Sequence, residues 1–458
     1  MKTKIFFLCL LLSLIYLPAE AQDESLPPLP KGPLILSGAA PEMQNADFWI
    51  KRLPDANQAL KTPEEIAQLN KEINETIAER TDVFKIKGMF RGIDIKEAIE
   101  KSYETIKSRK LFGVDDKYIT KDLFTDQILP NLNLDAVPNM VNIRWGVATT
   151  AASVRALPIW VKMLEEKGDI EFDQLQFTLI KLWTPVAVYH TSTDGKWYYV
   201  QAPYVRGWVE SKHIAFFKDQ DAVKEKVKSK DYVVVTGESV PVYAGPDFTA
   251  VLDRPSMGTV IPRVSQTDTA FLVEMPKRGE GGKVVLGRGY IKLSDDARTQ
   301  FPPYTQANVI RQAFKLLSAR YGWGGTYMGR DCSGFTFDVF TSMGVDLPRD
   351  SDQQAFAGTQ LGSFKPFEQS ELKKATLRQA ATPGITLLRM KMHMMLYLGE
   401  IDEKFYVIHS TWAERIGQDP VKDEKNRINQ VVVSDLDLNG NSYLGPLFHR
   451  IIQMSEVN

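Results

Sequence analysis

The segment Tyr321–Phe335, YGWGGTYMGRDCSGF, determines how the C-terminal part of the chain is interpreted. Gly322, Gly324 and Gly325 disfavour a helix in its first half, because glycine loses more conformational entropy in a helix than other residues do. After Cys332, apolar residues recur at helical spacing. The segment therefore predicts a glycine-rich loop followed by a helix, with Cys332 in the first turn of that helix.

Asp331 is a candidate N-cap, because its carboxylate can accept a hydrogen bond from a free amide of the first turn. A sulfur at this point lies at the positive end of the helix dipole, which favours the thiolate. These features suggest a reactive cysteine. A buried structural cysteine remains the plain alternative.

The chain has 458 residues, a length that predicts about three domains. Its formal net charge of −1 gives no overall field that would attract nucleic acid or anionic lipid. Residues 1–21 have a Lys-containing start, an apolar core and an Ala-Glu-Ala end, the pattern of a cleaved signal peptide. No later segment is apolar enough to predict a transmembrane helix. We therefore expect an exported protein, either periplasmic or secreted.

Export makes the cysteine count informative. Of the two cysteines, Cys9 would leave with the signal peptide, so Cys332 would have no partner for a disulfide. A single thiol in an oxidising compartment favours a catalytic role over a structural one.

The N-terminal part of the mature chain is predicted to be a Pro-rich linker (22–34) and then a helical segment (35–135). Thr62-Pro63-Glu64-Glu65 is a capping box with proline at the first helical position. Two apolar stripes at helical spacing predict helices that pack on a neighbouring domain. They are Ile66, Leu69, Ile73 and Ile77, and Ile95, Ile99, Tyr103 and Ile106.

From about Val141 the apolar pattern alternates, which predicts strands. Residues 186–190 and 196–200 flank a Thr-Ser-Thr-Asp-Gly turn and predict a hairpin. A second set of short strands is predicted at 232–235, 240–243, 270–274, 284–286 and 289–291. We interpret these sets as two small all-β barrels, residues 136–220 and 221–297.

Residues 298–458 are predicted to form an α+β domain. It begins with a helix at 308–317, followed by the segment around Cys332. Near its end, residues 392–398 and 405–410 predict a hairpin. With a turn centred on Ile401, His393 and His409 would be direct cross-strand neighbours, with Cβ atoms roughly 4.5–5.5 Å apart.

A thiol and two imidazoles suit nucleophilic catalysis. His393 would take the proton of Cys332 and later deliver it to a leaving amine. His409 would hold the ring of His393 in one tautomer, and the amide of Cys332 would stabilise an oxyanion. Pairing of Cys332 with an imidazolium is expected to lower its pKa to roughly 3.5–7.5. The rival for this residue set is a catalytic zinc site, although the chain has no close-spaced ligand pair such as Cys-x-x-Cys.

The motifs YGWGG, DCSGF, MHMMLYLG and VIHST together resemble NlpC-type papain-like cysteine peptidases, over roughly residues 305–455. The helical segment and the two barrels, which resemble bacterial SH3-like domains, point to the subgroup of γ-D-glutamyl-L-diamino acid endopeptidases. This resemblance implies cleavage of the γ-D-glutamyl–diamino acid amide in peptidoglycan stem peptides that carry a free N-terminal L-Ala, as in murein peptide recycling. It implies no cofactor and no metal.

By the same resemblance, Cys332 is the nucleophile, His393 the base and His409 the orienting residue. The positions that match the substrate groove are Tyr321, Trp323, Asp331, Ser333 and Ser351. For each of these a packing or capping role is the alternative. In the first barrel, Tyr204, Trp208 and Glu210 are candidates for contact with the L-Ala end.

Two other functions remain open at this point. One is a non-catalytic module that binds the cell wall. The other is an acyltransferase that passes the same thioester to an amine or alcohol.

Overall fold

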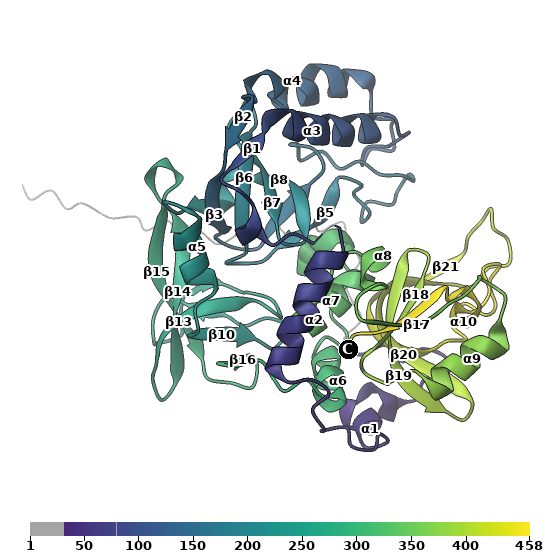
Figure 1. Cartoon of the computed structure of the whole chain (residues 1–458). Coiled ribbons are helices and arrows are strands. Elements are labelled where there is room, and N and C mark those ends of the chain that lie inside the picture. The colour runs from purple at the N-terminus through teal and green to yellow at the C-terminus, as the bar shows by residue number, and fades with distance from the viewer. Residues whose placement is uncertain (1–31, 79) are drawn as a thin grey trace, which may run out of the picture.

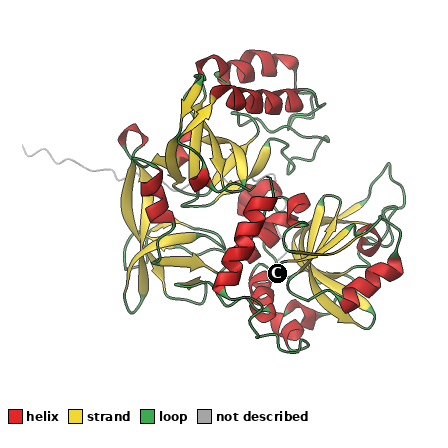
Figure 2. Cartoon of the chain, in the orientation of Figure 1, coloured by secondary structure: helices red, strands yellow, loops and turns green. Residues whose placement is uncertain are grey.

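The computed structural model describes residues 32–78 and 80–458, so the predicted signal peptide and most of the predicted linker lie outside the described residues. Strands gather in three bodies with helices between and above them (Figure 2). Within the described part of the chain, no helix is both long and apolar enough to cross a membrane.

The N-terminal segment is helical. Its helices are α1 (Ala46–Ile50), α2 (Pro63–Thr76), α3 (Gly92–Lys107) and α4 (Leu129–Asn131), with a π-helical stretch at Leu123–Ile128. The two short strands β1 (Met89–Arg91) and β2 (Met140–Asn142) pair with each other beside α3 (Figure 1).

The capping box predicted at the start of α2 is confirmed. The Thr62 side chain accepts from the amide of Glu65, and the Glu65 side chain accepts from the amide of Thr62. Leu69 and Ile73 of α2 are buried in one core with α6 (Gln306–Lys315) and α7 (Cys332–Thr341) of the C-terminal domain. In addition, Asn70 Nδ2 donates to Gly344 O at 2.8 Å. The prediction that this helix packs on a neighbouring domain is thus confirmed, and Figure 1 shows α2 crossing the middle of the molecule.

The second predicted stripe is also confirmed, because Ile95, Ile99, Tyr103 and Ile106 of α3 are all buried. They share a core with the first β-domain, by which we mean residues 144–216. Its seven strands form an antiparallel sheet in the order β5-β4-β8-β7-β6-β3-β9. These strands are β3 (Arg144–Ala148), β4 (Ala152–Arg155), β5 (Gln176–Ile180), β6 (Pro185–Thr191), β7 (Trp197–Ala202), β8 (Val205–Glu210) and β9 (Ile214–Phe216). β6 and β7 form the predicted hairpin.

The helix α5 (Gln220–Val227) leads into the second β-domain, residues 232–298, whose sheet has the order β12-β11-β15-β14-β13-β10-β16. Its strands are β10 (Tyr232–Val235), β11 (Val242–Tyr243), β12 (Val251–Asp253), β13 (Val260–Gln266), β14 (Ala270–Arg278), β15 (Val284–Lys292) and β16 (Ala297–Arg298). The separate strands predicted at 284–286 and 289–291 are wrong, because β15 is continuous. Gly289 stays inside this strand, where an added Cβ would lie 2.4 Å from Val242 Cγ1, so this glycine marks a close approach of neighbouring strands.

The C-terminal domain packs α6 (Gln306–Lys315) and α7 (Cys332–Thr341) against a six-stranded antiparallel sheet of order β17-β22-β18-β19-β20-β21. Its strands are β17 (Thr359–Ser363), β18 (Thr386–Met390), β19 (His393–Ile401), β20 (Lys404–Arg415), β21 (Lys425–Asp435) and β22 (Gln453–Glu456). The short helices α8 (Ser351–Gln354) and α10 (Leu447–Arg450) and the longer α9 (Ser370–Gln379) complete it.

A buried cluster of charged residues at α7 connects the C-terminal domain to both β-domains. Asp338 of α7 lies 2.6 Å from Lys181 Nζ of the first β-domain and 2.7 Å from Arg330 Nε. Lys181 also donates to Met257 O, and Arg330 donates to Glu238 O, both in the second β-domain. The two cations hold the pKa of Asp338 below its ordinary value although burial opposes them. The cluster therefore fixes the orientation of the helix that carries Cys332.

Replacement of Asp338 by Ala would remove the ion-pair partner of the buried Lys181. It would leave Arg330 with only the more exposed Glu238 carboxylate, 3.6 Å away. Removal of one partner from a buried pair costs about 3–5 kcal/mol, which we expect to lower the thermal midpoint by about 10 °C. Calorimetry of the variant checks this. The matched control is Glu371→Ala, which breaks an exposed ion pair with Lys374 and is expected to leave the midpoint unchanged. Equal midpoints for both variants would show that the junction is not held by this cluster.

Candidate active site

Cys332 is the first residue of α7, as predicted, and Asp331 is its N-cap, accepting from the amide of Gly334 at 2.7 Å. The preceding loop turns sharply, with φ of 56° at Gly324 and 82° at Gly325. Added Cβ atoms at these two glycines would lie 2.8 Å from side-chain atoms of strand β5. The glycines are thus required both by the backbone conformation and by the close approach of the first β-domain.

The hairpin that carries the two histidines has a tighter turn than the one predicted. Ile401 pairs with Lys404, and Asp402 and Glu403 form the turn with φ of 49° and 63°. Positive φ at both turn residues is typical of a type I′ turn, which suits the twist of the flanking strands. The prediction of a turn centred on Ile401, with His393 directly opposite His409, is therefore wrong.

A β-bulge between the turn and the two histidines brings their side chains to the same face of the sheet. If the register at the turn continued unchanged along the hairpin, His393 would be offset from the residue opposite His409 by an odd number of positions. The two side chains would then lie on opposite faces of the sheet. Between Tyr397 and Gly399 the register shifts by one residue, which makes the offset even. The two side chains are then diagonal neighbours on one face.

The histidine rings are in contact. His393 Nε2 lies 2.7 Å from His409 Nδ1, and His409 Nε2 lies 3.1 Å from Ser434 Oγ on β21. His409 is 1% exposed, and His393 is partly buried. The contact uses Nε2 of His393 and leaves its Nδ1 as the nitrogen that can exchange a proton with a thiol.

The sulfur of Cys332 lies against the backbone on both sides of His393. Its distance to Met392 O is 3.9 Å, and the amides of Met394 and Ser333 donate to it. Among the described residues, no hydrogen bond joins this sulfur directly to an imidazole. The β19–β20 pairing ends at Leu396, so the first residues of β19 are free of β20 where the sulfur approaches them.

Burial favours the neutral forms of all three groups. It raises the pKa of the Cys332 thiol to about 12, with a further contribution from the Asp331 carboxylate. It lowers the pKa of His393 to about 4, and Arg450 adds to this effect. The pKa of His409 is also lowered, well below its ordinary value. The expected low thiol pKa is therefore wrong for the free protein, in which desolvation of the sulfur dominates.

The geometry does not favour the zinc alternative. The nitrogens His393 Nε2 and His409 Nδ1 are bonded to each other and so are not both free for one ion. In residues 32–78 and 80–458, no group of three or more His, Cys, Asp or Glu side chains is arranged to hold a metal ion.

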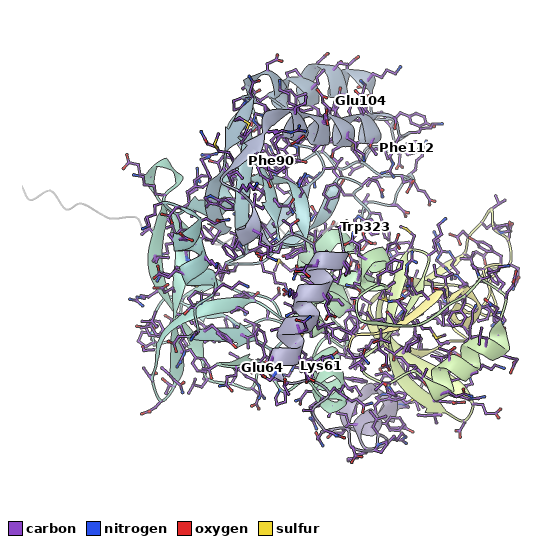
Figure 3. All side chains as sticks on the ribbon, viewed as in Figure 1. Lys61, Glu64, Phe90, Glu104, Phe112 and Trp323 are labelled. Atoms are coloured by element: carbon purple, nitrogen blue, oxygen red, sulfur yellow. The ribbon has the colours of Figure 1, made fainter. Side chains whose placement is uncertain are left out.

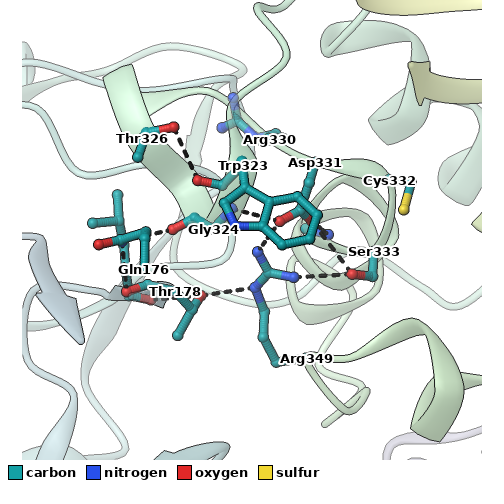
Figure 4. Close-up of polar contacts among 12 residues, drawn as sticks. Gln176, Thr178, Trp323, Gly324, Thr326, Arg330, Asp331, Cys332, Ser333 and Arg349 are labelled. Carbon is teal, nitrogen blue, oxygen red and sulfur yellow. Dashed lines mark hydrogen bonds and ion pairs between the residues drawn. The ribbon is translucent and has the colours of Figure 1, made fainter. Parts of the chain in front are cut away.

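Arg349 connects several residues around the N-terminus of α7 (Figure 4). Its Nη2 lies 2.7 Å from Asp331 Oδ2, its Nη1 lies 3.0 Å from Ser333 Oγ, and its Nε donates to Thr178 Oγ1 of β5 at 2.8 Å. Asp331 also accepts from the amide of Gly324 at 2.8 Å. Asp331 thus has a structural role at the N-terminus of α7.

Tyr321 and Trp323 lie where the C-terminal domain meets the first β-domain. Trp323 Nε1 donates to Asp173 O at 3.2 Å, and both rings pack against Phe172. Figure 3 shows Trp323 between the two bodies. Tyr321 lies close enough to Cys332 for a thiolate to raise the pKa of the tyrosine further, after burial.

The remaining candidates are placed differently. Ser351 is buried at the start of α8, whose N-cap is Asp350. Tyr204 packs against Phe337 of α7, which places it at the interface with the C-terminal domain. Trp208 is 0% exposed in the core of the first β-domain, so it cannot reach a substrate. Glu210 is paired with Lys212 and His213 of its own domain.

Comparisons with known proteins agree with this arrangement. Residues 318–433 match the NlpC/P60 family, and residues 158–210 match the SH3 domain of SH3b1 type. The C-terminal domain belongs to the NlpC/P60 family. Its match includes Cys332, His393 and His409.

Two relatives are each named gamma-D-glutamyl-L-lysine dipeptidyl-peptidase. The protein from Bacillus subtilis (strain 168) is 31% identical over 101 residues, which are 22% of this chain and 31% of the relative. The protein from Bacillus cereus (strain ATCC 10987 / NRS 248) is 26% identical over 215 residues, 46% of this chain and 57% of the relative. The matches thus span about a third and somewhat over half of the relatives' lengths.

A solved structure shares the fold over almost the whole chain. It is an NlpC/P60 endopeptidase from Photobacterium damselae subsp. piscicida, with a TM-score of 0.70 and 19% identity. The alignment covers 94% of this chain and 98% of that chain. The helical segment and both β-domains are therefore part of a fold already seen with an NlpC/P60 domain.

Sequence reasoning missed three residues around the NlpC/P60 site. Ser434 lies in an apolar strand, where nothing marks it as a histidine partner. Arg349 lies two residues before the predicted site residue Ser351, but its link to Asp331 depends on tertiary structure. Glu171 of the first β-domain is buried among groups of the NlpC/P60 domain, accepting from Trp412 Nε1 at 2.7 Å and lying 3.1 Å from Arg427.

The low pKa of His393 predicts loss of stability in acid. Between about pH 6.5, where an unfolded histidine titrates, and about pH 4, the unfolded chain binds more protons than the folded protein, so stability falls as the pH falls. In His393→Gln this part of the decline is absent, and the thermal midpoint should depend less on pH over this range. Calorimetry from pH 7.5 to 4 measures it, with His449→Gln as the control. An unchanged pH dependence in His393→Gln would contradict a neutral His393.

Proposed function

We propose that the protein is a cysteine endopeptidase that cleaves the γ-D-glutamyl–diamino acid amide of peptidoglycan stem peptides. The observation that carries this proposal is the set of Cys332, His393 and His409 at the mouth of α7, in an NlpC/P60 domain whose relatives are named for γ-D-glutamyl-L-lysine bonds.

Burial of the reacting groups dictates the order of proton transfers. The Cys332 thiol passes its proton to His393 Nδ1 as the sulfur attacks the γ-carbonyl carbon of D-Glu, so that no isolated thiolate is needed beforehand. The imidazolium then gives this proton to the leaving amine of the diamino acid. A thioester remains on Cys332. A water molecule then attacks the thioester carbon as it gives a proton to His393, the C–S bond breaks, and His393 returns this proton to the sulfur.

The oxyanion of the tetrahedral intermediate would be stabilised by the backbone at the N-terminus of α7. As the first residue of α7, Cys332 has an amide without an intrahelical partner, and within the described residues no hydrogen bond uses it. A free amide at the positive end of a helix is suited to the negative oxygen of a tetrahedral intermediate.

We propose in addition that the substrate carries a free N-terminal L-Ala. Three contacts of the first β-domain support this part: Gln176 Nε2 to Gly324 O at 2.9 Å, Trp323 Nε1 to Asp173 O, and Arg349 Nε to Thr178 Oγ1. They place this domain against the loop before Cys332, where it would limit the length of peptide on the acyl side. We also interpret the second β-domain as SH3-like, and the protein as exported for murein peptide recycling.

Cys332→Ala tests covalent catalysis. We expect at least a thousandfold loss of turnover on L-Ala-γ-D-Glu-L-Lys and on the diaminopimelate analogue, with a thermal midpoint close to that of the wild type. A chromatographic assay of released diamino acid measures turnover. Residual activity above about a thousandth would count against a thioester intermediate.

Two synthetic stem peptides test the restricted groove. One has a free L-Ala amine, and the other carries a muramyl group on that nitrogen. We expect mass spectrometry to find cleavage of the first peptide alone, because in this proposal the first β-domain closes the groove on the acyl side. Equal cleavage of both would overturn this part of the proposal and leave the bond specificity untouched.

A further inference from the structure

The hydrogen-bonded pair of His393 and His409 has a third member, Ser434. His409 Nε2 lies 3.1 Å from Ser434 Oγ, and this is the one side-chain hydrogen bond of that hydroxyl among the described residues. Ser434 is 0% exposed and His409 is 1% exposed, so bulk water does not replace either group as a partner.

The sheet fixes this contact. His409 pairs with Val432 in the β20–β21 ladder, and Val407 pairs with Ser434. Ser434 is therefore the diagonal neighbour of His409 on the same face. Three adjacent strands thus supply the row His393, His409 and Ser434, and its geometry does not depend on a mobile loop.

The direction of the hydrogen bonds in this row decides whether His393 can act as a base. To accept the thiol proton, His393 must be unprotonated at Nδ1, so its neutral ring carries the proton at Nε2. That N–H must donate to Nδ1 of His409. A neutral His409 that accepts at Nδ1 carries its own proton at Nε2, and this second N–H points at Ser434 Oγ. The opposite direction would place a proton on His393 Nδ1 and abolish its function as a base.

We infer that Ser434 is a positioning residue that accepts the Nε2–H of His409 and thereby holds both histidines in the tautomers that make His393 a base. This inference rests on the proposed peptidase function, because the contacts fix which atoms meet and the need for a base at His393 fixes the direction of the hydrogen bonds. During acylation the thiol proton moves to His393 Nδ1, while the protons on His393 Nε2 and His409 Nε2 stay in place. The row thus gains one proton, and His393 is the one member of the row that becomes charged.

The tautomer can be observed without any assay of activity. In wild-type protein labelled with 15N-histidine, the imidazole nitrogen shifts report which nitrogen carries the proton. There are five histidines in the sequence, and a His409→Gln spectrum assigns the relevant signals. We expect His409 protonated at Nε2 at pH 7. A wild-type His409 protonated at Nδ1 would overturn the inference.

Ser434→Ala removes the acceptor and should shift His409 toward the Nδ1-protonated form. We expect kcat to fall about 10-fold to 100-fold, by analogy with the loss of a hydrogen-bonding partner from a metal-bound imidazole, with KM nearly unchanged. Ser434→Thr, which keeps a hydroxyl, should restore most of kcat and the wild-type tautomer.

The matched control is Ser455→Ala. Ser455 is 1% exposed in β22 of the same sheet, and its hydroxyl has no hydrogen-bond partner among the described residues. We expect this variant to keep its kcat and the His409 tautomer. Equal kcat values for Ser434→Ala and Ser455→Ala would contradict the inference. Absence of stem-peptide cleavage by the wild type would instead refute the proposed function, and the nitrogen shifts would still test the tautomer.

Discussion

The hydrogen bond between His393 Nε2 and His409 Nδ1 is the interaction on which the candidate site depends. It exists because two strands place their side chains on one face, and that alignment requires the β-bulge between Tyr397 and Gly399. A hairpin with the same tight turn and no bulge would point the rings to opposite faces. The bulge is thus a functional element of the sheet.

The other bodies of the molecule hold the sulfur in place relative to those rings. Asp338 ties α7 to both β-domains through Lys181 and Arg330, while Arg349 ties the helix mouth to β5. Desolvation of the sulfur and of both rings favours their neutral forms. In the proposed reaction, the thiol proton is therefore transferred to His393 as the sulfur attacks.

Much of this arrangement was predictable from local sequence signals. The glycine loop, the Asp331 cap and the capping box at Thr62 are encoded by neighbouring residues, and all three are present in the structure. The hairpin register was not predictable, because a bulge depends on packing against adjacent strands. The roles of Arg349 and Ser434 were hidden for the same reason: their partners lie on other elements and become neighbours only in the folded sheet.

The most direct test of the central claim measures whether His393 removes the thiol proton. The rate of alkylation of Cys332 by iodoacetamide is compared at pH 7 in the wild type and in His393→Gln, which keeps a side chain of similar size without a basic nitrogen. The account predicts clearly slower alkylation of the variant, because its buried thiol keeps the raised pKa and has no acceptor for the proton. Equal rates in the two proteins would show that the sulfur and the imidazoles do not act together.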